Sequence, residues 1–129
     1  MNRPLRFLEI DDVLNLGRRL LGDPVPVRDM GLLNSAVLRP QTTFAGEYAY
    51  RNIYEMAGAL LQSIVGNHAL IDGNKRLGWL STAVFLEING VSVSHLTNDQ
   101  VFDFVLWVAA TSPSHGAITE RLTSLLTPT

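Results

Sequence analysis

Hydrophobic residues recur at three- and four-residue spacings along most of the chain, a pattern that predicts a mostly α-helical fold. The clearest stripe runs from Ile53 to Val65, where apolar side chains would share one face of a helix about four turns long. The segment Leu77–Ile88 is apolar on nearly every side, and Gly90 suits the left-handed position just beyond its end. We therefore expect this second helix to lie in the middle of the fold.

Capping residues predict two helices before these. Asp11 or Asp12 can cap a first helix that ends near Gly22. Asp29 can cap a second helix, and Pro40 would stop it.

Two more helices are expected near the end of the chain. Thr97 with Gln100 forms the pattern of a capping box before apolar residues at helical spacing, and a last helix should cover Ala117–Leu126. Short extended segments are expected at Leu5–Ile10 and Val91–Val93. The prediction is a compact helical bundle of about six helices with at most short β segments.

Length and composition restrict the function. The 129 residues suit one domain spanning 1–129, and 47% hydrophobic against 17% charged residues excludes a disordered chain. Ten basic and twelve acidic residues give a net charge of −2, which argues against a protein that coats nucleic acid, so no direct nucleic-acid partner is expected. The absence of cysteine excludes thiol catalysis, cysteine zinc sites and disulfides.

No segment predicts contact with a membrane. The first residues reach acidic side chains too soon for a signal peptide, and the longest apolar stretch, Leu77–Leu86, is far shorter than the roughly 18 residues of a membrane span. We therefore expect a soluble, cytoplasmic domain.

A run of polar residues separates the two most apolar segments. It reads His68-Ala69-Leu70-Ile71-Asp72-Gly73-Asn74-Lys75-Arg76. A turn that leads into a helix offers free N–H groups and the positive end of a dipole, which together attract anions. Gly73 permits close approach of the backbone, and Lys75 and Arg76 add positive charge. Lys75 is the only lysine among the ten basic residues.

The same run contains the other parts that phosphate transfer needs. Asp72 could hold Mg²⁺, which binds through one or two carboxylates plus phosphate oxygens. His68 could accept a proton from an attacking hydroxyl. The P-loop pattern fails because Asn74 follows Gly73, and the H-E-x-x-H zinc pattern fails because no second histidine lies one turn away.

Each of these residues also has an ordinary structural explanation. A hydrogen-bonded histidine at a helix end, turn-forming Asp and Asn, and a solvated basic first turn would account for them singly. Their combination argues for a site, because Glu55 and Glu87 are the only other charged residues from Ile53 to Ile88.

The run from His68 to Arg76 resembles the Fic/Doc superfamily motif H-x-F-x-[D/E]-[G/A]-N-[G/K]-R. Lys75 after Asn74 looks like the Doc branch, where Lys replaces the Gly of most Fic proteins. The resemblance covers roughly residues 5 to 110, because three further segments are similar to Doc-type toxins: Arg28–Leu33, Arg39–Gln41 and Phe85–Gly90.

This resemblance implies a Fic/Doc fold and a function. Doc-type toxins are protein kinases that transfer the γ-phosphate of ATP to a threonine of elongation factor Tu, which stops translation, and a Phd-type antitoxin neutralises them. Carried over to matching positions, His68 would be the base and Asp72 would help to hold Mg²⁺. The nucleotide phosphates would contact Gly73, Asn74, Lys75 and Arg76.

Two departures from the motif keep two alternatives open. Leu70 stands where the family usually has Phe, and Trp79 stands where Fic enzymes carry a second Arg that binds ATP phosphates. A Fic-type AMP transferase is disfavoured by Lys75 and Trp79. A catalytically silent Fic-fold protein that works by binding a partner is favoured only by Leu70 and Trp79.

Self-restrained Fic proteins carry an inhibitory helix of the type [S/T]-x-x-x-E-[G/N]. The nearest match begins at Thr43, but Tyr48 follows Glu47, and we interpret the match as coincidence. Any inhibition is therefore expected to come from a partner chain.

The remaining histidines and aromatic residues receive no catalytic role. His95 and His115 are expected near helix ends, and the aromatic side chains of Phe102, Phe104 and Trp107 are expected in the core or on a helix face.

Overall fold

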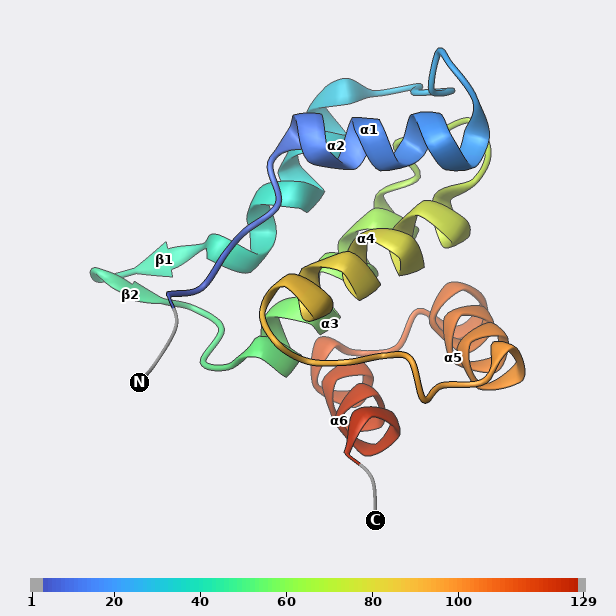
Figure 1. Cartoon of the computed structure of the whole chain (residues 1–129). Coiled ribbons are helices and arrows are strands. Elements are labelled where there is room, and N and C mark those ends of the chain that lie inside the picture. The colour runs from blue at the N-terminus through green and yellow to red at the C-terminus, as the bar shows by residue number, and fades with distance from the viewer. Residues whose placement is uncertain (1–3, 128–129) are drawn as a thin grey trace.

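The structure, a computed structural model, describes residues 4–127, and helices make up most of this range (Figure 1). The α-helices are α1 (Ile10–Leu21), α2 (Met30–Leu38), α3 (Ile53–Asn67), α4 (Asn74–Ile88), α5 (Asn98–Thr111) and α6 (His115–Leu126). A short 3₁₀ helix (Arg39–Gln41) follows α2, and β1 (Thr43–Phe44) pairs antiparallel with β2 (Glu47–Tyr48). The expectation of a mostly α-helical fold with about six helices is confirmed.

Helices α3 and α4 form the centre of the molecule. In Figure 1, α1 and α2 lie on one side of this pair and α5 and α6 on the other. All six helices contribute to one hydrophobic core, for example through Val13, Leu33, Leu60, Leu77, Phe104 and Ile118. The central pair approaches closely at Gly78, where an added Cβ would lie 2.9 Å from a methyl group of Val65. Burial of α4 within the fold follows the prediction.

Two of the six helix starts have the capping chemistry that the sequence indicates. Asp29 caps α2, and Thr97 and Gln100 form a capping box at α5. The prediction for α1 is wrong by a few residues, because Glu9 is the capping residue and Asp12 is its partner in a capping box.

The last helix also begins earlier than expected. Ser114 caps α6 by accepting from the N–H of Ala117, so the helix starts at His115.

The expected strand at Val91–Val93 is wrong, because neither of the strands described within residues 4–127 pairs with it. The N–H of Val91 donates to the carbonyl of Leu86, and that of Val93 donates to the carboxylate of Glu87. These bonds fold the segment back onto the end of α4.

Of the expected extended segment Leu5–Ile10, Ile10 belongs to α1, and residues 5–9 pair with neither strand found within residues 4–127. The backbone N–H and carbonyl of Arg6 instead form two hydrogen bonds, both 2.9 Å, with the side chain of Asn89.

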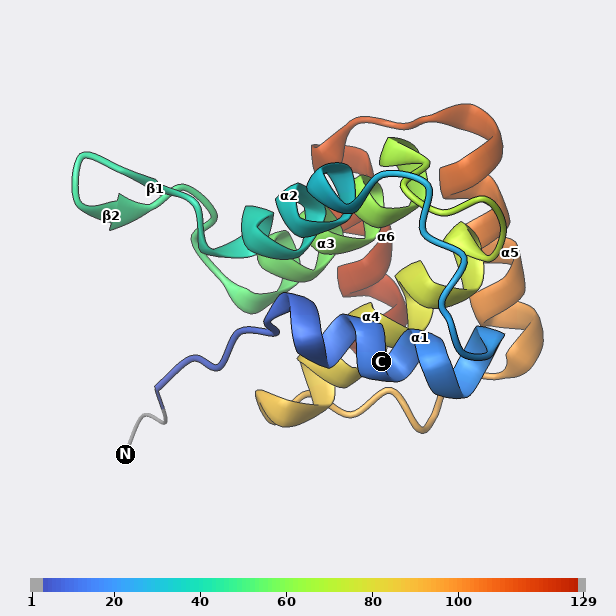
Figure 2. The same ribbon diagram turned by 90° about the horizontal axis from the view of Figure 1, so that it is seen from above.

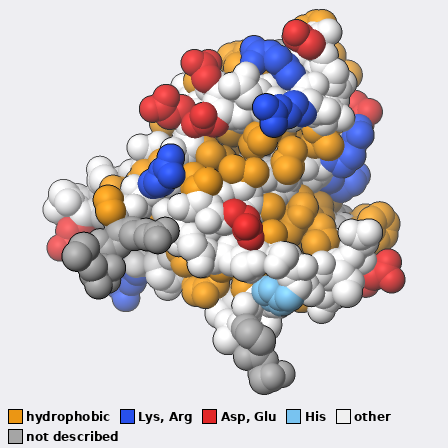
Figure 3. Space-filling model, in the orientation of Figure 1, with side chains coloured by type: hydrophobic (Ala, Val, Ile, Leu, Met, Phe, Trp, Pro, Cys, Tyr) orange, Lys and Arg blue, Asp and Glu red, His pale blue; other side chains and the backbone are white. Residues whose placement is uncertain are grey.

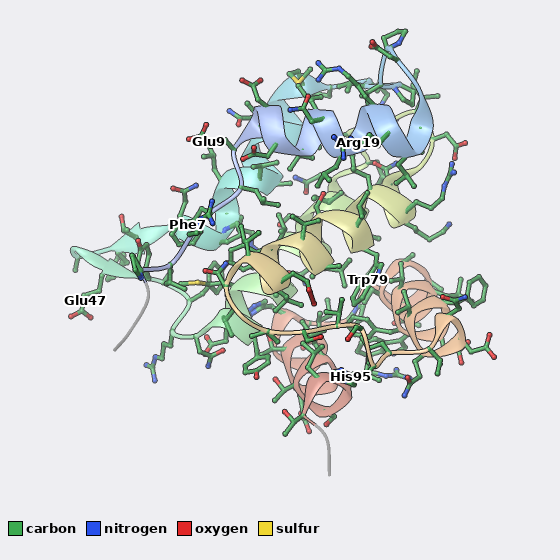
Figure 4. The ribbon with its side chains drawn as sticks, in the orientation of Figure 1. Phe7, Glu9, Arg19, Glu47, Trp79 and His95 are labelled. Atoms are coloured by element: carbon green, nitrogen blue, oxygen red, sulfur yellow. The ribbon has the colours of Figure 1, made fainter. Side chains whose placement is uncertain are left out.

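The hairpin of β1 and β2 was not predicted. Its tip residues, Ala45 and Gly46, have φ angles of 53° and 83°, the left-handed geometry of a tight hairpin turn. Figure 2 shows the hairpin projecting away from the helices, and Glu47 lies at this outer edge in Figure 4. The match to an inhibitory helix at Thr43–Glu47 is thus not helical. None of the helices within residues 4–127 is long and apolar enough to cross a membrane.

Candidate active site

The loop that follows α3, residues 68–73, is called the motif loop here. Its first residue, His68, ends α3 in the left-handed conformation, with φ 52° and ψ 41°. Residues other than glycine seldom adopt this conformation, and where they do the surrounding structure holds them. The guanidinium of Arg28 donates a hydrogen bond to the carbonyl of His68 and so supplies part of that hold.

The ring of His68 differs from those of the other two histidines. The Nε2 atom of His95 lies 3.2 Å from the carbonyl of Leu125, and that of His115 lies 2.8 Å from the carbonyl of Glu55. The His68 side chain is exposed and forms no hydrogen bond within residues 4–127. Among the three histidines, His68 is therefore the one whose ring has no hydrogen-bond partner within residues 4–127.

Backbone hydrogen bonds attach the motif loop to the segment between α1 and α2. The N–H groups of Arg28 and Asp29 both donate to the carbonyl of Ala69, at 2.8 and 3.0 Å. The N–H of Ile71 donates to the carbonyl of Pro26 at 2.8 Å. Leu70 lies between these bonds and is only 2% exposed, so it fills the core beneath the loop as the packing at this position requires.

The side chain of Asn74 closes the motif loop. Its Oδ1 accepts from the N–H of Leu70, and its Nδ2 donates to the carbonyl of Leu70, each at 3.0 Å. Both polar atoms of this amide are therefore engaged with the backbone. The predicted contact of Asn74 with phosphate stays a prediction, and its backbone N–H is the group that is free to make it.

Helix α4 begins without a side-chain cap. Gly73 is its N-cap residue with φ 91°, a left-handed conformation that glycine adopts without strain. A Cβ at this position would also lie 2.6 Å from a methyl group of Leu21. The first N–H groups of α4 are left without a capping acceptor, which is the arrangement that binds anions at helix N-termini.

A cavity of about 420 Å³ brings the predicted residues together. One wall holds the sequence-predicted site residues His68, Asp72, Gly73, Asn74, Lys75 and Arg76. The facing walls come from the second half of α3, from the end of α5 and from the turn between α5 and α6, through Gln62, Val65, Gly66, Val108, Ala109, Ser112 and Pro113. No motif marks this second group in the sequence, and only its apolar residues at helical spacing could have suggested that α5 packs nearby.

The charges at the cavity are exposed and loosely paired. Asp72 and Arg76 lie 4.0 Å apart, with side chains 87% and 59% exposed, and such a surface pair contributes little to stability. One carboxylate oxygen of Asp72 accepts from the N–H of Gly73 at 2.8 Å. The other oxygen of Asp72 and the exposed side chains of Lys75 and Arg76 can therefore rearrange around a bound ligand.

The donor set fits magnesium held together with phosphate. Residues 4–127 contain no group of three or more acidic, histidine or cysteine side chains that could hold a metal ion alone. Mg²⁺ needs less from a protein, because one or two carboxylates plus phosphate oxygens and water complete its six ligands. Asp72 offers one such carboxylate beside the uncapped start of α4.

Trp79 lies outside this cavity. Its ring packs edge-on against Phe104 with centroids 6.4 Å apart, and Figure 4 shows it on α4 near α5. It lines an apolar groove of about 430 Å³ together with Leu20, Leu80, Val101, Phe102, Val105 and Leu106. In Figure 3 hydrophobic side chains gather here, with Lys and Arg side chains beside the start of α4. Lys75 and Arg76 border both the groove and the cavity.

The aromatic residues of α5 take the two expected positions. Phe104 is buried in the core and stacks on the half-buried Trp107 at 6.2 Å, whereas Phe102 is 64% exposed on the helix face.

Comparison with known proteins agrees with this arrangement. The sequence model of the Fic/DOC family matches residues 7–86, a range that contains the motif loop and the start of α4. The chain is also 49% identical over 88 residues to the curated protein "Toxin Doc" of Mycolicibacterium smegmatis (strain ATCC 700084 / mc(2)155), an alignment that covers 68% of each chain.

Proposed function

The chain belongs to the Fic/DOC family, and we propose that it is the Doc-type toxin of a toxin–antitoxin system, a protein kinase that uses ATP. One observation carries the proposal. A histidine with a free ring, a carboxylate, and an uncapped helix N-terminus with two cations line the same cavity of about 420 Å³. These are the parts of a phosphoryl-transfer site.

The residues divide the reaction between them. The phosphates of ATP lie against the free N–H groups of α4 and the cations of Lys75 and Arg76. The hydroxyl oxygen of the target forms a bond to the γ-phosphorus, and its proton passes to a ring nitrogen of His68. The bond from the γ-phosphorus to the bridging oxygen breaks, and ADP leaves. The cations stabilise the charge that develops on the phosphoryl oxygens.

Asp72 is the residue that would hold magnesium. When bound there with the phosphates, the ion supplies positive charge that offsets theirs. The hydrogen bond from the N–H of Gly73 orients the carboxylate of Asp72 for this task.

Transfer of the γ-phosphate is favoured over transfer of AMP by two side chains. Lys75 brings a long cation to the first turn of α4, where most Fic proteins have glycine. Trp79 stands where Fic enzymes carry a second arginine that binds ATP phosphates. Its ring packs against α5 and lines the apolar groove, so this position offers the phosphates no positive charge.

The target and the inhibitor follow from the resemblance. We propose a threonine of elongation factor Tu, in the cytoplasm, as the acceptor and a Phd-type antitoxin as the neutralising partner. The apolar groove that borders Lys75 and Arg76 supports binding of a partner chain next to the cavity.

The test is a transfer reaction with two labels. Purified protein, Mg²⁺ and elongation factor Tu are incubated with ATP labelled at either the γ- or the α-phosphate. Label on the target from the γ-position alone is the expected result. Label from the α-position alone would replace the kinase proposal with AMP transfer.

A silent binding protein gives a different outcome. It would bind nucleotide but transfer neither label, and arrest of growth on expression would persist in His68→Ala. Loss of growth arrest in that variant, with its fold intact by circular dichroism, is the result that the kinase proposal requires.

A further inference from the structure

Arg39, in the 3₁₀ helix after α2, holds a half-buried guanidinium that binds neutral groups. Its Nη1 donates to Gln62 Oε1 at 2.7 Å, to Ser63 Oγ at 2.8 Å and to the carbonyl of Ala59 at 3.3 Å. Its Nε donates to the Tyr50 hydroxyl at 2.8 Å. Within residues 4–127 no carboxylate pairs with Arg39. Its contacts therefore fix the positions of neutral side chains on and beside α3.

Two routes lead from Arg39 to the turn between α5 and α6, residues 112–114, which we call the α5–α6 corner. In the first, Gln62 accepts from Arg39 and its Nε2 donates to the carbonyl of Pro113 at 3.1 Å. In the second, the ring of Tyr50 packs on His115, the residue that follows the corner, with centroids 4.9 Å apart. The first route reaches the corner itself, and the second reaches the first residue of α6 directly after it.

The corner belongs to the cavity wall that faces the start of α4. Ser112 and Pro113 line the cavity, as does Gln62 itself. Ser112 ends α5 in a left-handed conformation with φ 46°, which a non-glycine residue keeps only where contacts hold it. The hydrogen bond from Gln62 is such a contact, and it joins the corner directly to α3.

We propose that Gln62 is a positioning residue that sets how far the α5–α6 corner stands from the phosphate-binding start of α4. This inference rests on the proposed function in one respect, namely that the cavity binds nucleotide. The cation of Arg39 determines which way the Gln62 amide points, because the flipped amide would turn its NH₂ group toward the guanidinium. The Nε2 of Gln62 is thereby directed at the carbonyl of Pro113, so the contact of Gln62 with Arg39 helps to fix the position of the corner.

The experiment compares two variants at position 62 with a matched control on the same helix. Gln62→Met keeps the length of the side chain and loses both hydrogen bonds without adding charge. Gln62→Glu keeps an acceptor for Arg39 but cannot donate to Pro113. Ser63→Ala loses a different contact with Arg39 and touches no part of the corner.

Two readouts are expected to move together. Hydrogen exchange of the Ser112 and Ala117 amides, measured by NMR in the free protein, should speed up about 3- to 10-fold in both Gln62 variants, as for loss of one neutral hydrogen bond. In Gln62→Met the KM for ATP should rise by a similar factor, also about 3- to 10-fold, while kcat changes less than about 2-fold. Ser63→Ala should leave exchange at the corner and the KM unchanged.

The outcomes separate this inference from the proposed function. Unchanged exchange at the corner in both Gln62 variants would overturn it, and so would faster exchange with an unchanged KM in an enzyme whose wild type is active. An equal effect of Ser63→Ala would overturn it as well, because the effect would then reflect general loosening of α3. Absence of ATP binding by the wild type would instead contradict the proposed function, and the exchange measurement would still decide whether Gln62 holds the corner.

Discussion

The side chain of His68 is exposed, whereas its backbone is bound by Arg28 and by the closed motif loop. This separation makes His68→Ala an informative substitution, because alanine removes the ring and leaves the contacts of the backbone. We expect the rate of phosphate transfer to fall by about 10²- to 10⁴-fold, the usual contribution of a general base. The Kd for ATP, measured by calorimetry, should stay within about 2-fold of wild type. A variant that retained the wild-type rate would remove His68 from the reaction.

Asn74 illustrates the opposite case, a polar residue whose side chain is engaged in structure. Asn74→Ala leaves the N–H and carbonyl of Leu70 without partners in a partly buried place, and should lower the free energy of unfolding by about 1–3 kcal/mol. Asn74→Asp keeps the acceptor but not the donor and should lose about half as much. Urea denaturation followed by circular dichroism measures both. Equal stability of the two variants would contradict the paired hydrogen bonds.

The two residues also differ in what sequence alone could reveal. Type and spacing were enough to predict that His68, Asp72 and Lys75 lie close together, because the motif is continuous, and all three line one cavity. The inward hydrogen bonds of Asn74 and the contact from Arg28 could not be predicted, since they depend on the backbone path of the loop.

At the scale of elements, α3 and α4 cross closely at Gly78, and this close crossing limits which side chains the position can accept. Gly78→Ala would normally favour a helix by about 1 kcal/mol, but its Cβ would meet Val65 at 2.9 Å and both Ile64 and Leu61 at 3.5 Å. Overpacking should therefore prevail, and we expect a loss of about 1–3 kcal/mol in the free energy of unfolding. Thermal denaturation of the wild type and of Gly78→Ala measures the difference in the free energy of unfolding.

Gly116 in α6 provides the control for this substitution. Apart from its chain neighbours and the backbone of α6 itself, no atom of the described residues lies within 4 Å of a Cβ built there, so Gly116→Ala should be neutral or raise stability by up to about 1 kcal/mol. A gain of similar size at Gly78 would mean that the two helices can move apart to accept a methyl group.

The elements were predictable where local signals decide them. Periodicity and caps such as Asp29 and Thr97 act within one turn, so they fixed helix type and several starts. The strand expected at Val91–Val93 failed because a strand needs a partner, which local sequence does not show. The hairpin at Thr43–Tyr48 was missed because two residues a side give almost no alternating pattern.

At the scale of the whole molecule, stability rests on the apolar core and hardly on charge. The ion pairs within residues 4–127 are Arg18–Asp23 at 3.8 Å and Asp72–Arg76 at 4.0 Å, and the side chains of both are well exposed. Raising ionic strength from about 0.05 M to about 0.5 M should therefore change the free energy of unfolding by less than about 1 kcal/mol. Urea denaturation at the two salt concentrations measures this change in the free energy of unfolding.

Binding of ATP should depend on salt, unlike the free energy of unfolding. Lys75 and Arg76 are exposed cations at the cavity, and screening weakens their attraction for phosphates. The Kd for ATP should rise several-fold over the same range. A salt-independent Kd would mean that these cations do not face the phosphates.

The cavity wall formed by α3, α5 and the α5–α6 corner could not be predicted from the sequence. Val108 and Pro113 lie more than thirty residues beyond the motif and carry no catalytic chemistry, so nothing in their types marks them. Their contribution depends on how α5 and α6 return to α3, a property of the packed molecule.

The attachment of the motif loop to residues 26–29 determines which substitutions the loop can accept without changing its path. Its bonds join Arg28, Asp29 and Ile71 through main-chain atoms, and the side chains of Arg28 and Asn74 add bonds to main-chain atoms of the loop. Leu70 fills the core beneath the loop, at the position where the family motif usually has Phe. A substitution that changes only the exposed side chain of Ile71 removes none of these bonds, so it should leave the main-chain path of the loop in place.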